Sequence, residues 1–162
     1  MKRVIAESLA AVEGVLKERC EVHILLKLHP SEQEKSFYHE WVRARGLSAR
    51  VTIIENYDPL LLAKAADFLI VYNSTYAVDG FAMDRRVILL HDDSWFLEEF
   101  KMYRIFEYAG SPDELQAAIF KLLAKPEGKP GRWQEARREC LNEDGIDAEE
   151  YIVACLTGEK IP

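Results

Sequence analysis

The sequence predicts an α/β protein, with a three-layer, Rossmann-like, doubly wound parallel sheet of about five strands. Short apolar runs alternate along the chain with segments of helical periodicity, and the loops between them are short. The 162 residues are enough for one domain with a sizeable core and too few for two. We therefore expect one domain over residues 1–162, with the sheet and its crossovers at 22–124 and C-terminal helices within 132–157.

The first elements follow from apolar spacing and a capping pattern. Apolar residues at helical spacing predict a helix over residues 2–19. The apolar run at 22–28 is the first strand, which a His-Pro pair ends because proline has no N–H for a sheet ladder. Ser31 and Glu34 are typical of a capping box and predict a helix that runs to about residue 45.

The later elements continue the alternation, with two further helix starts. Asp58 before Pro59 predicts an N-cap, and Ser111 with Glu114 predicts a second capping box. The expected strands cover 51–54, 68–72, 87–90 and 104–108; the expected helices cover 59–65, 75–83, 112–124, 132–142 and 147–157, with a loop and a helical turn over 92–103.

The composition narrows the classes of function. A formal net charge of -7 argues against non-specific nucleic-acid binding, which needs a basic surface. The three cysteines have no metal-like spacing, and no apolar run approaches the roughly 20 residues of a membrane span. The start of the chain does not have the pattern of a signal peptide. We expect a cytoplasmic protein without a transmembrane segment, a metal or a cofactor, and peripheral membrane association stays open.

Polar residues collect where the strands of the predicted sheet end. Asn73, Ser74 and Thr75 follow the third strand, and hydroxyls beside the N–H groups of a helix start can bind phosphate. His29 follows the first strand, where its ring can donate to a phosphate oxygen, and Lys27 lies on the same side of that strand. The plainer interpretation is ordinary N-capping for the hydroxyls and a surface position for the other two.

Further carboxylates stand near the same predicted edge. Asp79 lies one helical turn beyond Thr75, where it can accept ribose hydroxyls or simply be an exposed helix residue. Glu55 and His91 follow two other strands. His91-Asp92-Asp93 has metal-ligand residue types, but adjacent carboxylates after a strand are more often a loop and an N-cap.

The motifs together resemble those of a known family. Lys27-Leu28-His29-Pro30, Asp67, Ser74-Thr75, Asp79 and Val87-Ile88 stand in this order. This order resembles the C-terminal half of GT-B glycosyltransferases of bacterial surface-polysaccharide synthesis: CDP-glycerol glycerophosphotransferases, capsule Kdo transferases and sialyltransferases. The resemblance covers about residues 22–124. It departs from the family at Asp84-Arg85-Arg86, where Gly-Lys-Pro is usual.

The resemblance implies a donor site and a missing half. It implies that His29 and Pro30, then Ser74 and Thr75, face the phosphates of a CMP-, CDP- or UDP-activated donor, with Asp79 near the ribose. GT-B enzymes place the acceptor site in an N-terminal domain, which would here come from a longer protein or a partner subunit, unless the chain is a degenerate stand-alone domain. We expect nucleotide binding without transfer by this chain alone.

Two other classes of function remain open. Half of a UDP-GlcNAc 2-epimerase-like enzyme shares the half-fold and would prefer UDP. A non-catalytic nucleotide-binding or assembly module would pack against another chain through exposed aromatics such as Trp95, Phe96 or Trp133. A receiver-type signalling domain is disfavoured, since no acidic pair follows the first strand.

Overall fold

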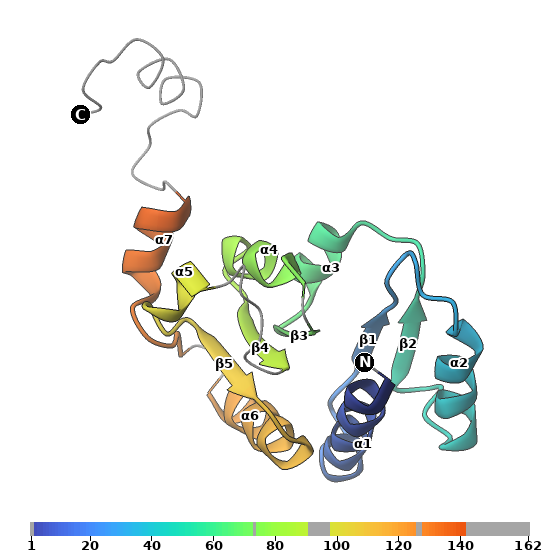
Figure 1. Ribbon diagram of the computed structural model, residues 1–162. Helices are drawn as coiled ribbons and strands as arrows, with labels where there is room; N and C mark the ends of the chain where they lie inside the picture. The colour runs from blue at the N-terminus through green and yellow to red at the C-terminus, as the bar shows by residue number, and fades with distance from the viewer. Residues whose placement is uncertain (1, 73, 91–97, 126–127, 142–162) are drawn as a thin grey trace, which may run out of the picture.

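Strands and helices alternate along the chain, which confirms the predicted α/β class (Figure 1). The structure, a computed structural model, describes residues 2–72, 74–90, 98–125 and 128–141. The strands are β1 (Ile24–Lys27), β2 (Val51–Ile54), β3 (Phe68–Tyr72), β4 (Arg86–Leu90) and β5 (Phe106–Ala109). The helices are α1 (Lys2–Glu18), α2 (Lys35–Ala44), α3 (Pro59–Ala65), α4 (Tyr76–Ala82), α5 (Glu98–Lys101), α6 (Pro112–Ala124) and α7 (Trp133–Leu141).

The strands form two parallel sheets. β1 pairs with β2, whereas β3, β4 and β5 form a second sheet with β4 in the middle. The prediction of a single sheet is therefore wrong, because within the described ranges no hydrogen-bonded ladder joins β1 to β3. Apolar periodicity predicts which residues form strands, but backbone hydrogen bonds decide which strands are neighbours, and periodicity does not report them.

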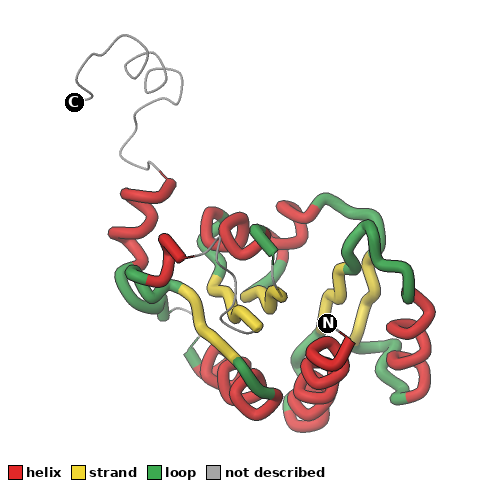
Figure 2. Tube along the Cα trace, viewed as in Figure 1, coloured by secondary structure: helices red, strands yellow, loops and turns green. Residues whose placement is uncertain are grey.

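Two apolar clusters hold the helices against the sheets. In β4, Ile88 and Leu90 face the first cluster, whereas Val87 and Leu89 face the second, as the two-residue period of a strand requires. The first cluster contains buried residues of α1, α2 and α6, and the second contains residues of α3, α4 and α7. Helices α1 and α6 lie side by side (Figure 2). The core thus includes α1 and α7, outside residues 22–124.

Arg50 fixes the direction of α1. Its guanidinium donates to the carbonyl oxygens of Leu16 at 2.6 Å and Val22 at 2.8 Å, and also to that of Arg19. These carbonyls belong to the end of α1 and the turn after it, and Arg50 directly precedes β2. The C-terminal end of α1 therefore lies at the amino edge of the first sheet, so α1 runs back along the strands.

Two of the predicted helix starts are confirmed. The side chain of Asp58 accepts a hydrogen bond from the N–H of Leu60 at 2.8 Å. Ser111 accepts from the N–H of Glu114 at 3.3 Å, and the Glu114 carboxylate accepts from the N–H of Gly110 at 2.7 Å. Apart from α2, the element boundaries agree with the prediction to within two residues, and the helix expected at 147–157 lies outside the described residues.

The predicted capping box at Ser31 is wrong. Helix α2 begins at Lys35, and its first turn has no side-chain cap. The Ser31 hydroxyl instead lies 2.7 Å from the His29 ring, and the Glu32 carboxylate accepts the N–H of Glu34 at 2.8 Å. The Ser31 hydroxyl therefore bonds the His29 imidazole instead of a backbone N–H of α2. The spacing of Ser31 and Glu34 in the sequence does not show this competing partner.

Helix α7 docks on the second sheet through Trp133. The indole is 3% exposed, its ring packs edge-on against Phe81, and its N–H donates to Asp84 at 3.0 Å. Gly131, with a positive φ of 57°, precedes the helix, and a Cβ there would lie 2.1 Å from the Tyr103 carbonyl oxygen. Burial of Trp133 removes it as an interface aromatic.

Asp84→Asn should make the stability of the protein depend less on pH between about pH 6 and pH 3. Burial tends to raise the pKa of Asp84, but hydrogen bonds from Lys129 and Trp133 outweigh it and hold the pKa below its usual range. A carboxyl group whose pKa is lowered by folding stabilises the protein above its unfolded pKa and loses that stabilisation as pH falls through the folded pKa. Asparagine tolerates the positive φ of 57° at this position.

The measurement is urea unfolding between about pH 6 and pH 3, the range in which aspartates titrate. The midpoint of Asp84→Asn should lie below that of the parent at pH 6 and fall less steeply toward pH 3. Asp67→Asn changes the same charge at an exposed position and is the control. Parallel profiles for Asp84→Asn and the parent would contradict the role given to Asp84.

Candidate functional site

The predicted motifs lie at the carboxyl ends of two different sheets. His29 and Pro30 follow β1 in the first sheet, and Ser74 and Thr75 follow β3 in the second. Asn73 lies outside the described residues. Among the described residues, no hydrogen bond joins the two motifs. Strand-end position is therefore as expected, while direct contact between the motifs is not seen.

The exposed ring of His29 is oriented by Ser31. The backbone N–H of Ser31 points at Nδ1 from 3.2 Å, and the Ser31 hydroxyl is 2.7 Å from the same nitrogen. A backbone N–H can only donate, so Nδ1 accepts, and the neutral ring then carries its proton on Nε2. The imidazole is thereby fixed in the tautomer that offers an N–H from Nε2.

Lys27 places a positive charge at the ends of β1 and β2. Its ammonium donates to the carbonyl oxygens of Leu28 at 2.6 Å and Glu55 at 3.0 Å, and its side chain is half-buried. An ammonium has three N–H donors, so one remains beyond these two bonds. Lys27 is the last residue of β1, two residues before His29, and its role beside His29 in a ligand site stays a prediction.

Glu55 lies in a polar cluster that was not predicted from the sequence. The Glu55 carboxylate bonds Lys35 at 2.7 Å and lies 3.5 Å from the His39 ring. The hydrogen bond from Lys35 is the main cause that lowers the pKa of Glu55, and burial opposes it. Lys35 and His39 are four residues apart on α2, so their shared helical face was the signal in the sequence.

Glu32, in the loop between β1 and α2, carries a second carboxylate that contacts α2. It accepts a hydrogen bond from the Tyr38 hydroxyl at 3.1 Å, and burial together with this carboxylate raises the pKa of Tyr38 to about 12. With Glu55, two carboxylates balance Lys27 and Lys35 at the end of the first sheet. The charges of these four side chains cancel, so an anion at the end of the first sheet would be bound by individual N–H donors and not by a net positive charge.

Ser74 and Thr75 have different hydrogen bonds at the start of α4. The Ser74 Oγ accepts the N–H of Tyr76 at 3.2 Å, which is the N-capping interpretation of this residue. Its own hydroxyl hydrogen is not used in that bond and can still be donated. The exposed Thr75 makes no capping hydrogen bond with its side chain.

Asp79 is half-buried within α4, one turn beyond Thr75. The burial of Tyr76 is the largest cause that raises the pKa of that phenol, and the charge of Asp79 raises it further. The Tyr76 hydroxyl donates to the Pro59 carbonyl oxygen at 2.6 Å, which ties α4 to α3. Asp79 therefore stands beside a fixed aromatic ring near the end of β3.

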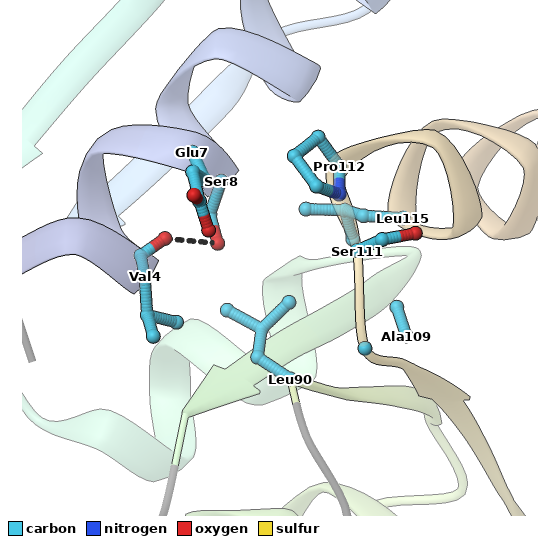
Figure 3. A pocket seen from close by; sticks show the side chains of 9 residues that line it. Val4, Glu7, Ser8, Leu90, Ala109, Ser111, Pro112 and Leu115 are labelled. Atoms are coloured by element: carbon cyan, nitrogen blue, oxygen red, sulfur yellow. Dashed lines mark hydrogen bonds between the residues drawn. The ribbon is translucent and has the colours of Figure 1, made fainter.

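A small cavity lies at the carboxyl ends of β4 and β5 (Figure 3). Val4 and Ser8 of α1, Leu90, Ser111 and Pro112 are among its lining residues. Its volume of about 10 Å³ is room for one water molecule at most, so it cannot hold a nucleotide. It does show that the first turns of α1 lie at the carboxyl edge of the second sheet.

A wider groove runs between α2 and β2. Its volume is about 540 Å³, and it is lined by Ser36, His39, Glu40, Val42, Arg43, Ser48, Val51 and Ile53. Neither His29 nor Ser74 lines it. No sequence pattern indicated this groove, because it depends on how far α2 stands from its strand.

The described ranges hold no group of three or more His, Cys, Asp or Glu side chains that could bind a metal ion. The His91-Asp92-Asp93 stretch, Trp95 and Phe96 lie outside those ranges. Within them, no helix has both the length and the apolar character of a bilayer span.

Comparison of the chain with protein-family models and with curated proteins finds no match.

Proposed function

We propose that this chain is the donor-nucleotide-binding domain of a GT-B type glycosyl- or glycerophosphotransferase in bacterial cell-surface polysaccharide synthesis. In this proposal, the parallel strands and their helices are a Rossmann-like half of a GT-B fold. The observation that carries the proposal is the placement of His29 and of Ser74 and Thr75 at carboxyl ends of parallel strands, where α/β proteins bind ligands.

The available donors suit a phosphate. The tautomer of His29 leaves an N–H on Nε2, Ser74 keeps its hydroxyl hydrogen, and the Thr75 side chain makes no capping bond. The Lys27 ammonium, at the same edge of the first sheet, has a third N–H beyond its bonds to two carbonyl oxygens. In this proposal these groups donate to the phosphates of the nucleotide donor, and Asp79 accepts the ribose hydroxyls.

The proposed reaction is attack by an acceptor hydroxyl on the activated carbon or phosphorus of the donor. As that bond forms, the bond to the nucleotide breaks and negative charge builds on the leaving phosphate. Hydrogen bonds from His29, Ser74 and Thr75 stabilise this charge. The acceptor and its base belong to a partner domain in this proposal, so the chain alone binds nucleotide and does not transfer.

The test is a calorimetric or NMR titration of the folded chain with CMP, CDP, UMP and UDP. His29→Ala and Thr75→Val should each weaken binding about tenfold, which corresponds to one hydrogen bond to a charged group. Thr75→Val is preferred to Ser74→Ala as the sharper variant, since it leaves the cap of α4 intact. His23→Ala removes an exposed histidine ahead of β1, at the opposite edge, and should bind like the parent.

The outcome of this titration separates the alternatives. The donor-site proposal fails if no nucleotide binds at millimolar concentration, or if His29→Ala and Thr75→Val both bind like the parent. Binding of CMP or CDP in preference to UDP favours the polysaccharide transferases. A preference for UDP favours the 2-epimerase-like alternative at the same site.

A further inference from the structure

We propose that Glu32 is a positioning residue for His29, which holds the turn between β1 and α2 in the shape that keeps the N–H of the neutral imidazole on Nε2. This role rests on the proposed function in one respect only, the nucleotide phosphate to which that N–H would donate. The effect of Glu32 on the imidazole itself can be measured without nucleotide, so either proposal can fail alone.

The turn that carries His29 is closed by a backbone hydrogen bond. The N–H of Glu32 donates to the carbonyl oxygen of His29 at 2.9 Å, so these four residues form a β-turn with Pro30 and Ser31 at its centre. The ring of Pro30 fixes φ near the value that the first central position of such a turn requires. The same turn brings the backbone N–H of Ser31 to 3.2 Å from Nδ1 of the His29 ring. The tautomer of His29 therefore depends on the shape of the turn.

Of the two contacts that Ser31 makes with Nδ1 of His29, only the backbone contact selects a tautomer. The Ser31 hydroxyl, 2.7 Å from Nδ1, can donate to a bare nitrogen or accept from a protonated one. The Ser31 N–H can only donate, so a proton on Nδ1 would face another N–H. Within the described ranges, the hydrogen bonds of the His29 ring are all made by Nδ1, which leaves the Nε2 N–H for a ligand.

Glu32 connects the end of this turn to the apolar core. One carboxylate oxygen accepts the N–H of Glu34 at 2.8 Å, and the other accepts the hydroxyl of Tyr38 at 3.1 Å. Tyr38 is buried in the first apolar cluster, so its hydroxyl is a fixed donor. The start of the turn is fixed as well, because Leu28 is buried and its N–H donates to the carbonyl oxygen of Ile54 at 2.9 Å. The exposed turn is thus held at both ends, and Glu32 makes the side-chain contacts at the second end.

A simpler role for Glu32 is to satisfy the N–H of Glu34 ahead of α2, whose first turn has no side-chain cap. In that role Glu32 would stabilise the start of α2 and leave the His29 ring unaffected. A positioning role differs because a side chain that binds a ligand keeps its geometry only when its supporting contacts are themselves fixed. The tautomer of His29 therefore distinguishes the two roles.

The experiment is ¹⁵N NMR of the His29 ring in the full chain at about pH 8, where an ordinary imidazole is neutral. A protonated and a bare ring nitrogen have well-separated resonances, so their averaged positions give the ratio of the two tautomers. In the folded parent, the ratio of the Nε2-protonated to the Nδ1-protonated form should be at least about fivefold higher than in the urea-unfolded chain, the factor for one neutral hydrogen bond. Glu32→Ala should return this ratio most of the way to the unfolded value.

Matched variants separate the contacts of Glu32 from its charge. Tyr38→Phe removes one of the two side-chain bonds, and Glu32→Gln has one carbonyl oxygen for two donors, so each should shift the ratio part of the way. Glu40→Ala removes the same charge from an exposed position on α2 and should leave the ratio unchanged. Ser31→Ala keeps the backbone N–H and should leave it unchanged too.

Three results would overturn the positioning role. The first is a folded parent with the tautomer ratio of the unfolded chain. The second is a parental ratio in Glu32→Ala, Glu32→Gln and Tyr38→Phe alike. The third is a shift in Ser31→Ala as large as that in Glu32→Ala, which would give the tautomer to the Ser31 hydroxyl instead of the turn.

A double-mutant cycle with CDP connects Glu32 to the proposed phosphate site. Glu32→Ala should weaken CDP binding about threefold in the parent and not at all in His29→Ala, because it acts only through that ring. Removal of a negative charge would strengthen the binding of an anion, so the expected loss has the opposite sign to a charge effect. Equal losses in both backgrounds would overturn the role of Glu32 at this site. If no nucleotide binds while the tautomer ratio still shifts in Glu32→Ala, the proposed function fails and the positioning of His29 by Glu32 stands.

Discussion

Glu107→Leu should destabilise the protein by about 3–5 kcal/mol, the cost of leaving a buried charge without its partner. Arg86 opens β4 with a guanidinium whose side chain is 7% exposed, and it bonds Glu107 at 3.0 Å and the Lys125 carbonyl oxygen at 2.7 Å. Its Nε–H has no acceptor within the described residues. Loss of Glu107 leaves this cation with one carbonyl oxygen as its partner. Urea unfolding at neutral pH measures the loss.

Two further variants isolate the ion pair. Lys121 bonds the other oxygen of Glu107 at 2.8 Å from an exposed position, so Lys121→Ala should cost less than about 1 kcal/mol. The double variant Arg86→Met with Glu107→Leu removes both charges and should recover most of the stability that Glu107→Leu loses. If Glu107→Leu costs no more than Lys121→Ala, the pair contributes nothing through its burial.

Phe81→Ala should cost about 3–5 kcal/mol, as expected for deletion of a fully buried aromatic ring. Phe81 is 0% exposed, and its ring meets those of Trp133, Phe100 and Phe106 at centroid distances of 4.8, 6.1 and 6.4 Å. The Arg137 guanidinium lies over the same ring at 5.8 Å. The substitution therefore opens a cavity at the point where α7 packs against α4.

Phe81→Ala should also change the local environment of Trp133 and α7, in addition to the overall stability. Because Trp133 loses its main ring contact, its fluorescence should shift to longer wavelength, and protease should cleave sooner ahead of α7. Phe37→Ala is the matched control, since Phe37 is 41% exposed on α2 and should cost less than about 1 kcal/mol. A Phe81→Ala variant with parental protease resistance at α7 would contradict the role assigned to this ring.

The sequence predicted the elements better than their arrangement. Asp58 and Ser111 could be recognised as caps because a cap and its helix are neighbours in the chain. The cap at Ser31 failed because the His29 ring competed for the hydroxyl. The division into two sheets could not be foreseen, since a buried strand has the same apolar pattern whether its neighbour is present or absent.

The candidate site shows the same limit. That His29 and Ser74 stand at carboxyl ends of strands follows from the order of the elements. That they belong to different sheets does not, and neither does the bond from Ser74 Oγ to the N–H of Tyr76. The salt bridge between Lys35 and Glu55 depends on how α2 packs, which residue spacing alone does not fix.

Among the described residues, β1 pairs with a strand on one edge only, and its other edge bears on the solubility of the chain. Exposed strand edges are templates for aggregation, and proteins oppose this with mutual charge repulsion. A formal charge of -7 gives this chain such repulsion at neutral pH. Added salt screens the repulsion, and acidification toward the isoelectric point removes it. The solubility of the chain should therefore decline in both conditions while the fold itself is intact.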